Sequence, residues 1–212
     1  MAILDGNLEK VSEFTIRRLS NYFRILSELE KRGVVTVSSA SLAELGAITS
    51  AQVRKDLSYF GSFGTRGLGY KVVELKEAIV AILGLDRRWT LALFGAGFLG
   101  HALFFHDGFR EDGFHFIHVF DVDDAKVGTK WRDVAITHQR HAAESLRREP
   151  VDIGVIATPP SAARDVVDLV VRGGVKGVLN FAPTQVQVPE GVWLRNVNLA
   201  VALESLSFYL SQ

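Results

Sequence analysis

The sequence contains no cysteine and only one methionine among its 212 residues. A chain without cysteine forms no disulfide, thiolate metal site or thiol nucleophile, which is typical of proteins from a reducing cytoplasm. No uninterrupted apolar run approaches the roughly 20 residues that a membrane span requires. The first residues also lack the basic segment and apolar core of a signal peptide. We therefore expect a cytoplasmic protein with no membrane partner.

The chain also lacks net charge, because 24 lysines and arginines balance 24 aspartates and glutamates. The two signs are unevenly distributed. Residues 1–72 hold 10 basic and 7 acidic side chains, whereas residues 73–212 hold 14 and 17. A small basic excess at one end is compatible with a nucleic-acid-binding module on a neutral body.

The first part of the chain has the pattern of a winged helix-turn-helix. Apolar residues recur at helical spacing over 13–32 and again over 72–85, which predicts two long amphipathic helices. Between them we expect two short helices, one stopped at Gly46 and the next capped by Thr49 or Ser50. Two short helices around a glycine-containing turn are typical of DNA-binding modules. The glycine-rich segment 60–70 predicts a β-hairpin wing.

From Trp89 onward, buried strands alternate with helices. Continuous apolar runs predict strands over 90–94, 114–120, 151–157 and 175–181. Strands of this kind between helices predict a parallel sheet covered on both faces, and so an α/β fold.

The last predicted helix, 199–210, has one charged residue, Glu204, and is apolar almost all round. Such a terminal helix must be buried on more than one face. We therefore divide the chain into a DNA-binding domain over 1–85, a sheet domain over 86–196 and a dimerisation helix over 197–212.

A glycine-rich loop, GAGFLG, follows the first strand of the sheet domain and opens a helix. In this context the glycines allow a tight turn, close approach to a pyrophosphate and close helix packing, as in Rossmann dinucleotide-binding domains. Asp121 ends the next strand, where a carboxylate binds ribose hydroxyls, and no arginine follows it to accommodate the 2′-phosphate of NADP. The predicted NAD(H)-binding residues are Gly95, Ala96, Gly97, Phe98, Leu99, Gly100, Asp121, Thr158, Pro159, Asn180 and Phe181.

We predict neither catalytic residues nor metal ligands. A dehydrogenase needs a general acid or base beside the nicotinamide. The later strand ends offer Thr158 and Asn180, which are not proton carriers. His101 and His106 follow the glycine loop, but without a nearby carboxylate they are more typical of structural side chains.

The predicted recognition helix directs Val53, Leu57 and Phe60 to the core and leaves a polar outer side. Glutamine pairs with adenine and arginine with guanine, whereas lysine, serine and tyrosine hold phosphates. Arg66, in the wing, is placed like a side chain that enters a narrow minor groove. The predicted DNA-binding residues are Arg17, Arg18, Ser39, Ser50, Gln52, Arg54, Lys55, Ser58, Tyr59, Arg66 and Lys71.

Several segments together resemble the Rex family of redox-sensing repressors: AQVRKDLSYFG at 51–61, RGLGY at 66–70, the glycine loop, FDVD at 120–123, GVLNFAP at 177–183 and NVNL at 196–199. They occur in the family's order along nearly the whole chain. The resemblance implies a homodimeric repressor that binds a palindromic operator and senses the NADH/NAD+ ratio, with NADH releasing DNA. It also implies that the C-terminal helix is exchanged between subunits.

Three positions depart from the resemblance. Many Rex proteins have an arginine in the glycine loop, a tyrosine in the following helix and an aspartate before the last helix. This sequence has Phe98, His106 and Asn198 there. The bulky Phe98 ring is expected to narrow the pyrophosphate site, and the lost charges to weaken dinucleotide binding and the response to NADH.

Two further hypotheses stay open from the sequence alone. One is a small NAD-dependent oxidoreductase, which hydride turnover would reveal. The other is a DNA-bound regulator that ignores the cofactor, which a titration of operator binding against NADH and NAD+ would reveal.

Overall fold

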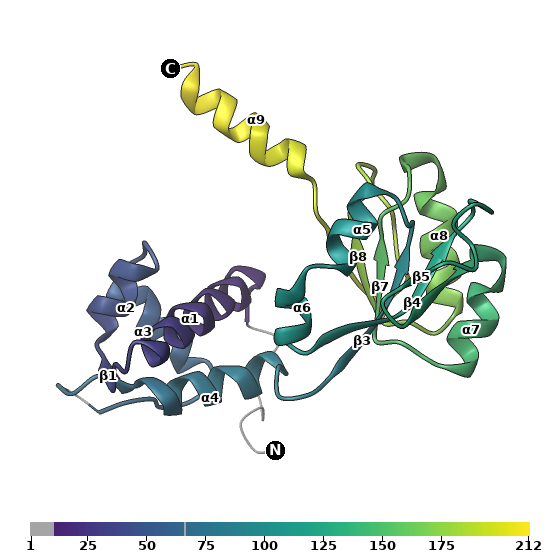
Figure 1. Cartoon of the computed structure of the whole chain (residues 1–212). Helices are drawn as coiled ribbons and strands as arrows, with labels where there is room; N and C mark the ends of the chain where they lie inside the picture. Colours follow the sequence, from purple (N-terminus) through teal and green to yellow (C-terminus); the bar gives the residue numbers. More distant parts are fainter. Residues whose placement is uncertain (1–10, 66) are drawn as a thin grey trace. The chain divides into compact units, whose positions relative to one another are not determined.

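The computed structural model describes residues 11–65 and 67–212, in two compact units (Figure 1). The first unit ends at Arg87 and the second runs from Arg88 to Gln212. The predicted boundary, between residues 85 and 86, lies two residues before this one. Arg66, predicted to enter the minor groove, lies outside the described residues. No helix in the described ranges is long and apolar enough to cross a membrane.

The first unit contains the predicted helix-turn-helix. Its elements are α1 (Glu13–Lys31), β1 (Thr36–Val37), α2 (Ser39–Leu45), α3 (Ser50–Ser58), β2 (Tyr70–Lys71) and α4 (Val72–Leu83). Ser38 caps α2 by accepting from the backbone N–H of Ser41, and Thr49 caps α3 by accepting from that of Gln52. These side chains replace hydrogen bonds that the first helical turn cannot make internally. Of the two residues predicted to cap α3, Thr49 and Ser50, Thr49 does so.

The predicted β-hairpin wing contains less strand than expected. Its return strand, β2, pairs with β1 in antiparallel register, and within the loop a single bridge joins Thr65 to Gly69. Gly64 and Gly69 both have positive φ angles, and a Cβ on either would lie about 2.5 Å or less from a backbone oxygen. Two glycines are therefore required for the chain to fold back on itself here.

A fully buried carboxylate, Asp56, joins α3 to α1. Arg18 donates to both of its oxygens, from Nε at 2.6 Å and from Nη2 at 2.7 Å. The Tyr22 hydroxyl donates at 2.8 Å and Gln52 Nε2 at 2.7 Å. Burial raises the pKa of Asp56, but the hydrogen bonds from Arg18, Tyr22 and Gln52 hold it below its usual range. The carboxylate is therefore ionised and fully bonded.

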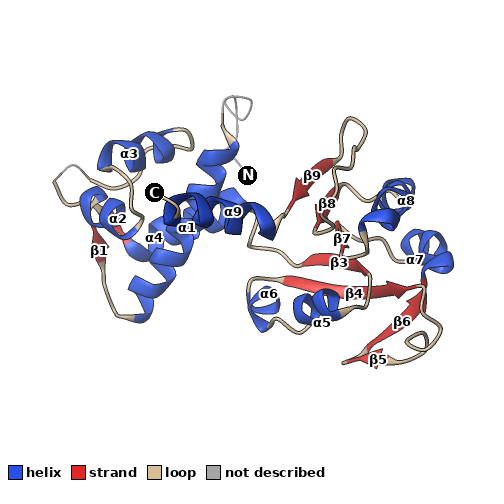
Figure 2. Cartoon of the chain, turned by 90° about the horizontal axis from the view of Figure 1, so that it is seen from above, coloured by secondary structure: helices blue, strands red, loops and turns tan. Residues whose placement is uncertain are grey.

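The second unit contains a seven-stranded sheet in the order β5-β6-β4-β3-β7-β8-β9, which Figure 2 shows from β9 to β5. All neighbouring pairs are parallel except β5 with β6. The strands are β3 (Trp89–Phe94), β4 (Phe114–Asp121), β5 (Lys130–Trp131), β6 (Val134–His138), β7 (Ile153–Ile156), β8 (Gly177–Asn180) and β9 (Trp193–Asn196). After β3, the chain forms β4, β6 and β5 on one side of it, then crosses back and forms β7, β8 and β9 on the other side. The point of return, between β3 and β7, is where ligands bind in sheets of this order.

Helices cover both faces of the sheet, as predicted. They are α5 (Phe98–Phe104), α6 (Asp107–Glu111), α7 (Ala142–Arg148) and α8 (Pro160–Arg172), with a short 3-10 helix at Gln139–His141. A further helix, α9 (Leu199–Leu210), follows the last strand. Along β3, Ala92 and Phe94 pack in one core with α7 and α8, and Leu91 and Leu93 pack in the other with Phe104 of α5. The sequence did not predict α6 or β5, which are too short to show a periodicity.

Helix α9 agrees with the predicted bounds but has no buried residue. Its apolar side chains are largely exposed, with Leu210 at 87% and Tyr209 at 72%. Figure 1 shows α9 projecting away from the sheet.

We expect Asp56→Asn to lower the free energy of unfolding of the first unit by about 3–5 kcal/mol, because Arg18 and Tyr22 lose a buried charged partner. The native carboxylate stabilises the fold above its unfolded pKa, and this contribution is lost as the pH falls through the lowered folded pKa. The variant has no such pH dependence. Urea unfolding followed by circular dichroism measures the loss.

Tryptophan fluorescence provides an internal control, because Trp89, Trp131 and Trp193 all belong to the second unit. The urea concentration at the midpoint of the fluorescence transition should be the same in Asp56→Asn as in the native chain. Glu44→Gln, which changes an exposed carboxyl of α2, should stay within about 0.5 kcal/mol. Equal stability of Asp56→Asn and Glu44→Gln would contradict the role given to Asp56.

Candidate nucleic-acid interface and dinucleotide site

The outer face of α3 presents the predicted DNA-reading side chains. Arg54, Lys55 and Ser58 are exposed, whereas Val53 and Leu57 are buried in the core of the first unit. Since Asp56 ties α3 to α1, this polar face is held by a rigid support. An exposed face of this composition can donate to base edges and phosphates.

A hollow of about 400 Å³ lies next to this face, between α2, α3 and the wing. Arg54 donates from Nη1 to the Ser39 hydroxyl at 3.1 Å, which brings together two predicted DNA-binding residues from different helices. The hollow is lined by Ser38, Ser39, Arg54, Phe63, Thr65, Gly67, Gly69 and Tyr70.

Two predicted DNA-binding side chains are engaged inside the unit instead. Arg18 and Gln52 donate to the buried Asp56, so the structure gives both a positioning role. Tyr59 is half-buried and packs against the core. The positioning role of Arg18 was not predicted, because a local sequence pattern cannot pair Arg18 with Asp56, which lies 38 positions away.

The remaining predicted residues of the first unit lie at or near the surface. Arg17 forms an ion pair with Glu13 at 2.8 Å, and Lys71 with Glu74 at 2.6 Å, and all four side chains are solvent-accessible. Exposed pairs of this kind are weak, so both cations can exchange their partner for a phosphate. Ser50, in the first turn of α3, is half-buried.

The glycine loop turns at the carboxyl end of β3, beside β7. A Cβ at Gly95 would lie 2.6 Å from the Ala157 carbonyl oxygen, and one at Gly100 would lie 1.9 Å from the Gly95 carbonyl oxygen. A Cβ at Gly97, in contrast, would meet nothing within 4 Å. Two of the three glycines are thus required by the protein's own packing, and Gly97 faces open space where a pyrophosphate can approach.

Asp121 holds the loop in place from the end of β4. Its Oδ2 accepts from the Ala96 backbone N–H at 2.6 Å, and its Oδ1 accepts from that of Asp123 at 2.9 Å. Burial raises its pKa, but these bonds and Lys126 bring the value below the usual range. The ionised oxygens keep lone pairs for ribose hydroxyls. Asp121 therefore acts first as a positioning group, which the sequence did not predict.

Lys126 is the cation that the sequence analysis overlooked near Asp121. Its Nζ lies 3.4 Å from Asp121 Oδ2 and 3.4 Å from Asp123 Oδ2. Two carboxylates thus share this one ammonium group, which leaves little of its charge for a 2′-phosphate. The geometry still favours NAD(H) over NADP(H).

Thr158, directly after the end of β7, supplies the clearest sign of a ligand. Its Oγ1 is buried and has no hydrogen-bond partner in the structure. Buried hydroxyls are nearly always bonded, so an unsatisfied one beside Gly95 fits a group that a dinucleotide would provide. Pro159 lies next to it as the cap of α8.

Asn180 differs from its predicted role. Its side chain is fully buried, donates to the Ala182 and Thr184 carbonyls and to Asn196 Oδ1, and accepts from the Ala182 N–H. With every group engaged, Asn180 shapes the loop after β8 and joins it to β9. The half-buried Phe181 packs on the α5 side of the sheet.

The Phe98 side chain is 99% exposed at the start of α5, so the fold itself does not hold its ring in place. The narrowing of the pyrophosphate site by Phe98 stays a prediction. His101 packs on Phe105 and Trp131, at ring-centroid distances of 4.4 and 5.1 Å, and His106 packs on Phe109. Within the described ranges no group of three or more metal-binding side chains comes together.

Two family models match the two parts of the chain. One, described as putative DNA-binding protein N-terminus, matches residues 10–58. The other, described as CoA binding domain, matches residues 86–184. The matches fall on the helix-turn-helix and on the parallel sheet.

Curated relatives match nearly the full length. A redox-sensing transcriptional repressor Rex from Carboxydothermus hydrogenoformans is 49% identical over 199 residues, covering 94% of this chain and 96% of the relative. The Rex protein of Syntrophomonas wolfei is 48% identical, covering 95% and 96%.

Solved structures of a Rex-family repressor called RSP are also similar. The complex of RSP with NAD+ and operator DNA is 38% identical with a TM-score of 0.91, covering 94% of this chain and 92% of that one. The complex with NADH is 37% identical with a TM-score of 0.88, covering 95% and 94%.

We expect the glycine loop to separate binding from folding. Gly97→Ala should leave the fold intact, because its Cβ meets open space, but weaken NAD+ binding roughly tenfold by obstructing the approach of the pyrophosphate. Gly100→Ala should instead destabilise the second unit. Isothermal titration with NAD+ and urea unfolding by tryptophan fluorescence measure the two effects. Unchanged NAD+ affinity in Gly97→Ala would show that the dinucleotide does not cross this loop.

Proposed function

The chain belongs to the Rex family of redox-sensing transcriptional repressors, and we propose that it binds a palindromic operator as a homodimer and responds to the NADH/NAD+ ratio. The observation that supports this best is the unsatisfied Thr158 hydroxyl beside Gly95 of the glycine loop. The other unit of the same chain presents Arg54 and Lys55 on the exposed face of α3. Because the function requires contact with the genome, we place the protein in the cytoplasm.

We propose that Arg54 and Lys55 make the specific contacts and that Ser39, Ser50 and Ser58 hold phosphates. Arg54 lines the hollow between α2, α3 and the wing, where its guanidinium can reach a base edge in a bidentate manner. Arg17 and Lys71 would add contacts to the DNA backbone. Arg18 and Gln52 contribute by orienting α3.

The dinucleotide acts as effector in this proposal, and the protein is not an enzyme. The polar groups at the carboxyl ends of the strands include Asp121, His138, Thr158 and Asn180. Asp121 and Asn180 are engaged within the fold, and the Thr158 hydroxyl does not ionise near neutral pH. His138 ends β6, two strands away from β3, and its Nδ1 accepts from the Arg140 N–H. An oxidoreductase would need a proton carrier beside the nicotinamide, so this alternative is disfavoured.

We propose that α9 provides the dimer contact. A helix with Leu203, Phe208 and Tyr209 all more than 60% exposed is unstable as a free surface element, and an identical subunit can cover it by exchange. The exchange would also fix the spacing of two recognition helices on a two-fold operator.

Operator binding tests the assignment of the recognition face. Arg54→Ala and Lys55→Ala should each weaken binding by about 1–3 kcal/mol while leaving the fold unchanged. Fluorescence anisotropy with the operator measures the affinity. Lys31→Ala, an exposed cation at the end of α1, is the matched control and should bind nearly as tightly as the native chain. If both α3 variants retained native affinity, another surface would have to read the DNA.

The NADH response tests the departures from the family. Asn198 carries no charge where many Rex proteins have an aspartate, and His106 lacks the hydroxyl of the tyrosine, so we expect operator release to need more NADH than in the double variant His106→Tyr, Asn198→Asp, by about tenfold. Asn198 caps α9 by accepting from the Ala200 N–H, a bond that aspartate makes equally well, so this change adds charge without disturbing the helix. Operator release by micromolar NADH from the native chain, with NAD+ inert, would refute the expected weakening.

A further inference from the structure

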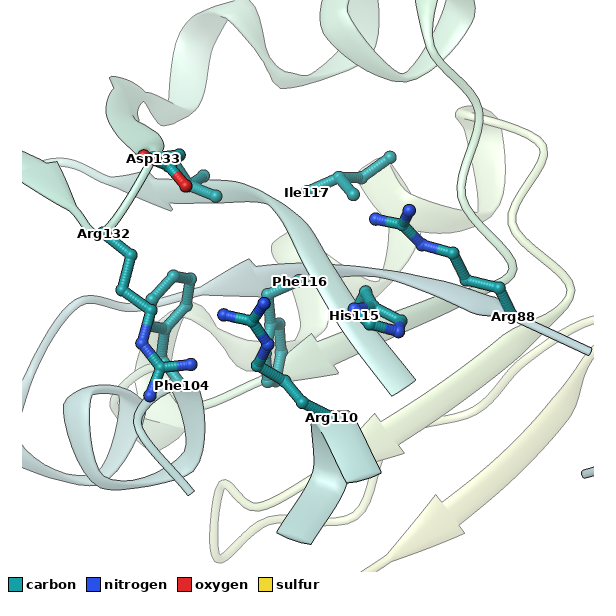
Figure 3. Close-up of a pocket in the computed structure, with 9 residues that line it drawn as sticks. Arg88, Phe104, Arg110, His115, Phe116, Ile117, Arg132 and Asp133 are labelled. Carbon is teal, nitrogen blue, oxygen red and sulfur yellow. The ribbon is translucent and has the colours of Figure 1, made fainter. Parts of the chain in front are cut away.

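The sheet unit contains a cavity that no residue of the glycine loop lines, and Figure 3 shows its lining residues. Its volume is about 230 Å³. Arg88 directly precedes β3, His115 lies at the start of β4 and Val134 begins β6, so the cavity is at the amino ends of these strands. The dinucleotide site is at their carboxyl ends. The proposed function leaves this cavity without a role.

Three arginines and a histidine line the cavity. Among the described residues, neither Arg88 nor Arg110 has an ion pair, and Figure 3 shows Arg88, His115 and Arg110 next to one another. Arg132 is already fixed in place, by an ion pair of 2.7 Å with Asp107 and by the face of the Phe105 ring at 5.3 Å.

The positive charges are not balanced within the cavity. Asp133 is its only acidic lining residue. Burial lowers the pKa of His115, and the charges of Arg88 and Arg110 lower it further. Both guanidinium groups are therefore close enough to act on the same imidazole. A bound anion would relieve this repulsion.

Beside the cations lies an apolar wall. Phe104 at the end of α5, Phe116 and Ile117 of β4 and Val134 of β6 line the same cavity. Ligand sites commonly combine an apolar surface for the body of a molecule with a few polar groups that orient it. A free inorganic ion would use only the cationic side.

We propose that this cavity binds a small organic phosphate, with the phosphate held by Arg88, Arg110 and Arg132 and an apolar or aromatic body against Phe104 and Phe116. The planar guanidinium group matches phosphate oxygens in a two-point geometry, so arginines are the residues expected for this ligand class. The site is distinct from that of the dinucleotide: α5 separates Phe98 from Phe104 by about 10 Å along its axis.

Titration of the full-length protein with phenyl phosphate, followed by NMR at the His115 imidazole, tests the proposal. We expect the His115 signals to shift on binding and the affinity to fall about tenfold in both Arg88→Gln and Arg110→Gln, since each removes a charge-assisted hydrogen bond. Arg148→Gln, an exposed arginine of α7, is the matched control and should bind like the native chain. Circular dichroism verifies that the variants fold.

Inorganic phosphate provides the second arm and should bind more weakly than phenyl phosphate. Equal affinity for phenyl phosphate and inorganic phosphate would contradict the proposal that the apolar wall binds an organic group. Unchanged His115 signals, or native affinity in both arginine variants, would contradict the proposal that the phosphate binds in this cavity. Loss of binding in Asp121→Asn but not in Arg110→Gln would assign the probe to the dinucleotide site. Operator binding in the arginine variants should stay native, so failure here is separate from failure of the proposed function.

Discussion

Burial of a carboxylate costs several kcal/mol unless hydrogen bonds replace the water that it loses. Among the described residues, Asp56 and Asp121 are the buried charged side chains, at 0% and 7% exposure. Each one belongs to a different unit, and each is bonded to the element that we propose meets a ligand. Asp56 holds α3 against α1, and Asp121 holds the Ala96 N–H at the turn of the glycine loop.

This arrangement explains why neither site depends on flexible loops alone. Loss of Asp56 would free Arg18 and Gln52, and α3 would lose these hydrogen bonds to α1. Loss of Asp121 would release the backbone that must approach a pyrophosphate closely. Rigid support of this kind lowers the entropy that binding would otherwise cost, so the two buried carboxylates serve affinity as well as stability.

Much of the fold could be predicted because it depends on local pattern. The bounds of α9, the cap Thr49 and the glycine loop all follow from residues near one another in sequence. The role of Arg18 could not be predicted, because its partner Asp56 lies 38 positions away in sequence. The bond by which Asn180 joins β9 could not be predicted either, because Asn196 lies 16 positions away. Asp56 falls on the buried face with Val53 and Leu57, and that spacing was the one signal that could have marked it.

The residues of the dinucleotide site differ in whether they can distinguish NADH from NAD+. Asp121 and the glycine loop would contact groups that NAD+ and NADH share, and a ligand shifts an equilibrium only by its differential affinity for the two states. Discrimination between NADH and NAD+ must therefore depend on residues other than Asp121 and the glycine loop. Asn198 opens α9, the helix that we propose joins the subunits, and His106 opens α6 after the loop helix α5. An aspartate at position 198 would place a negative charge at the start of α9, whereas Asn198 contributes only the hydrogen bond that caps this helix.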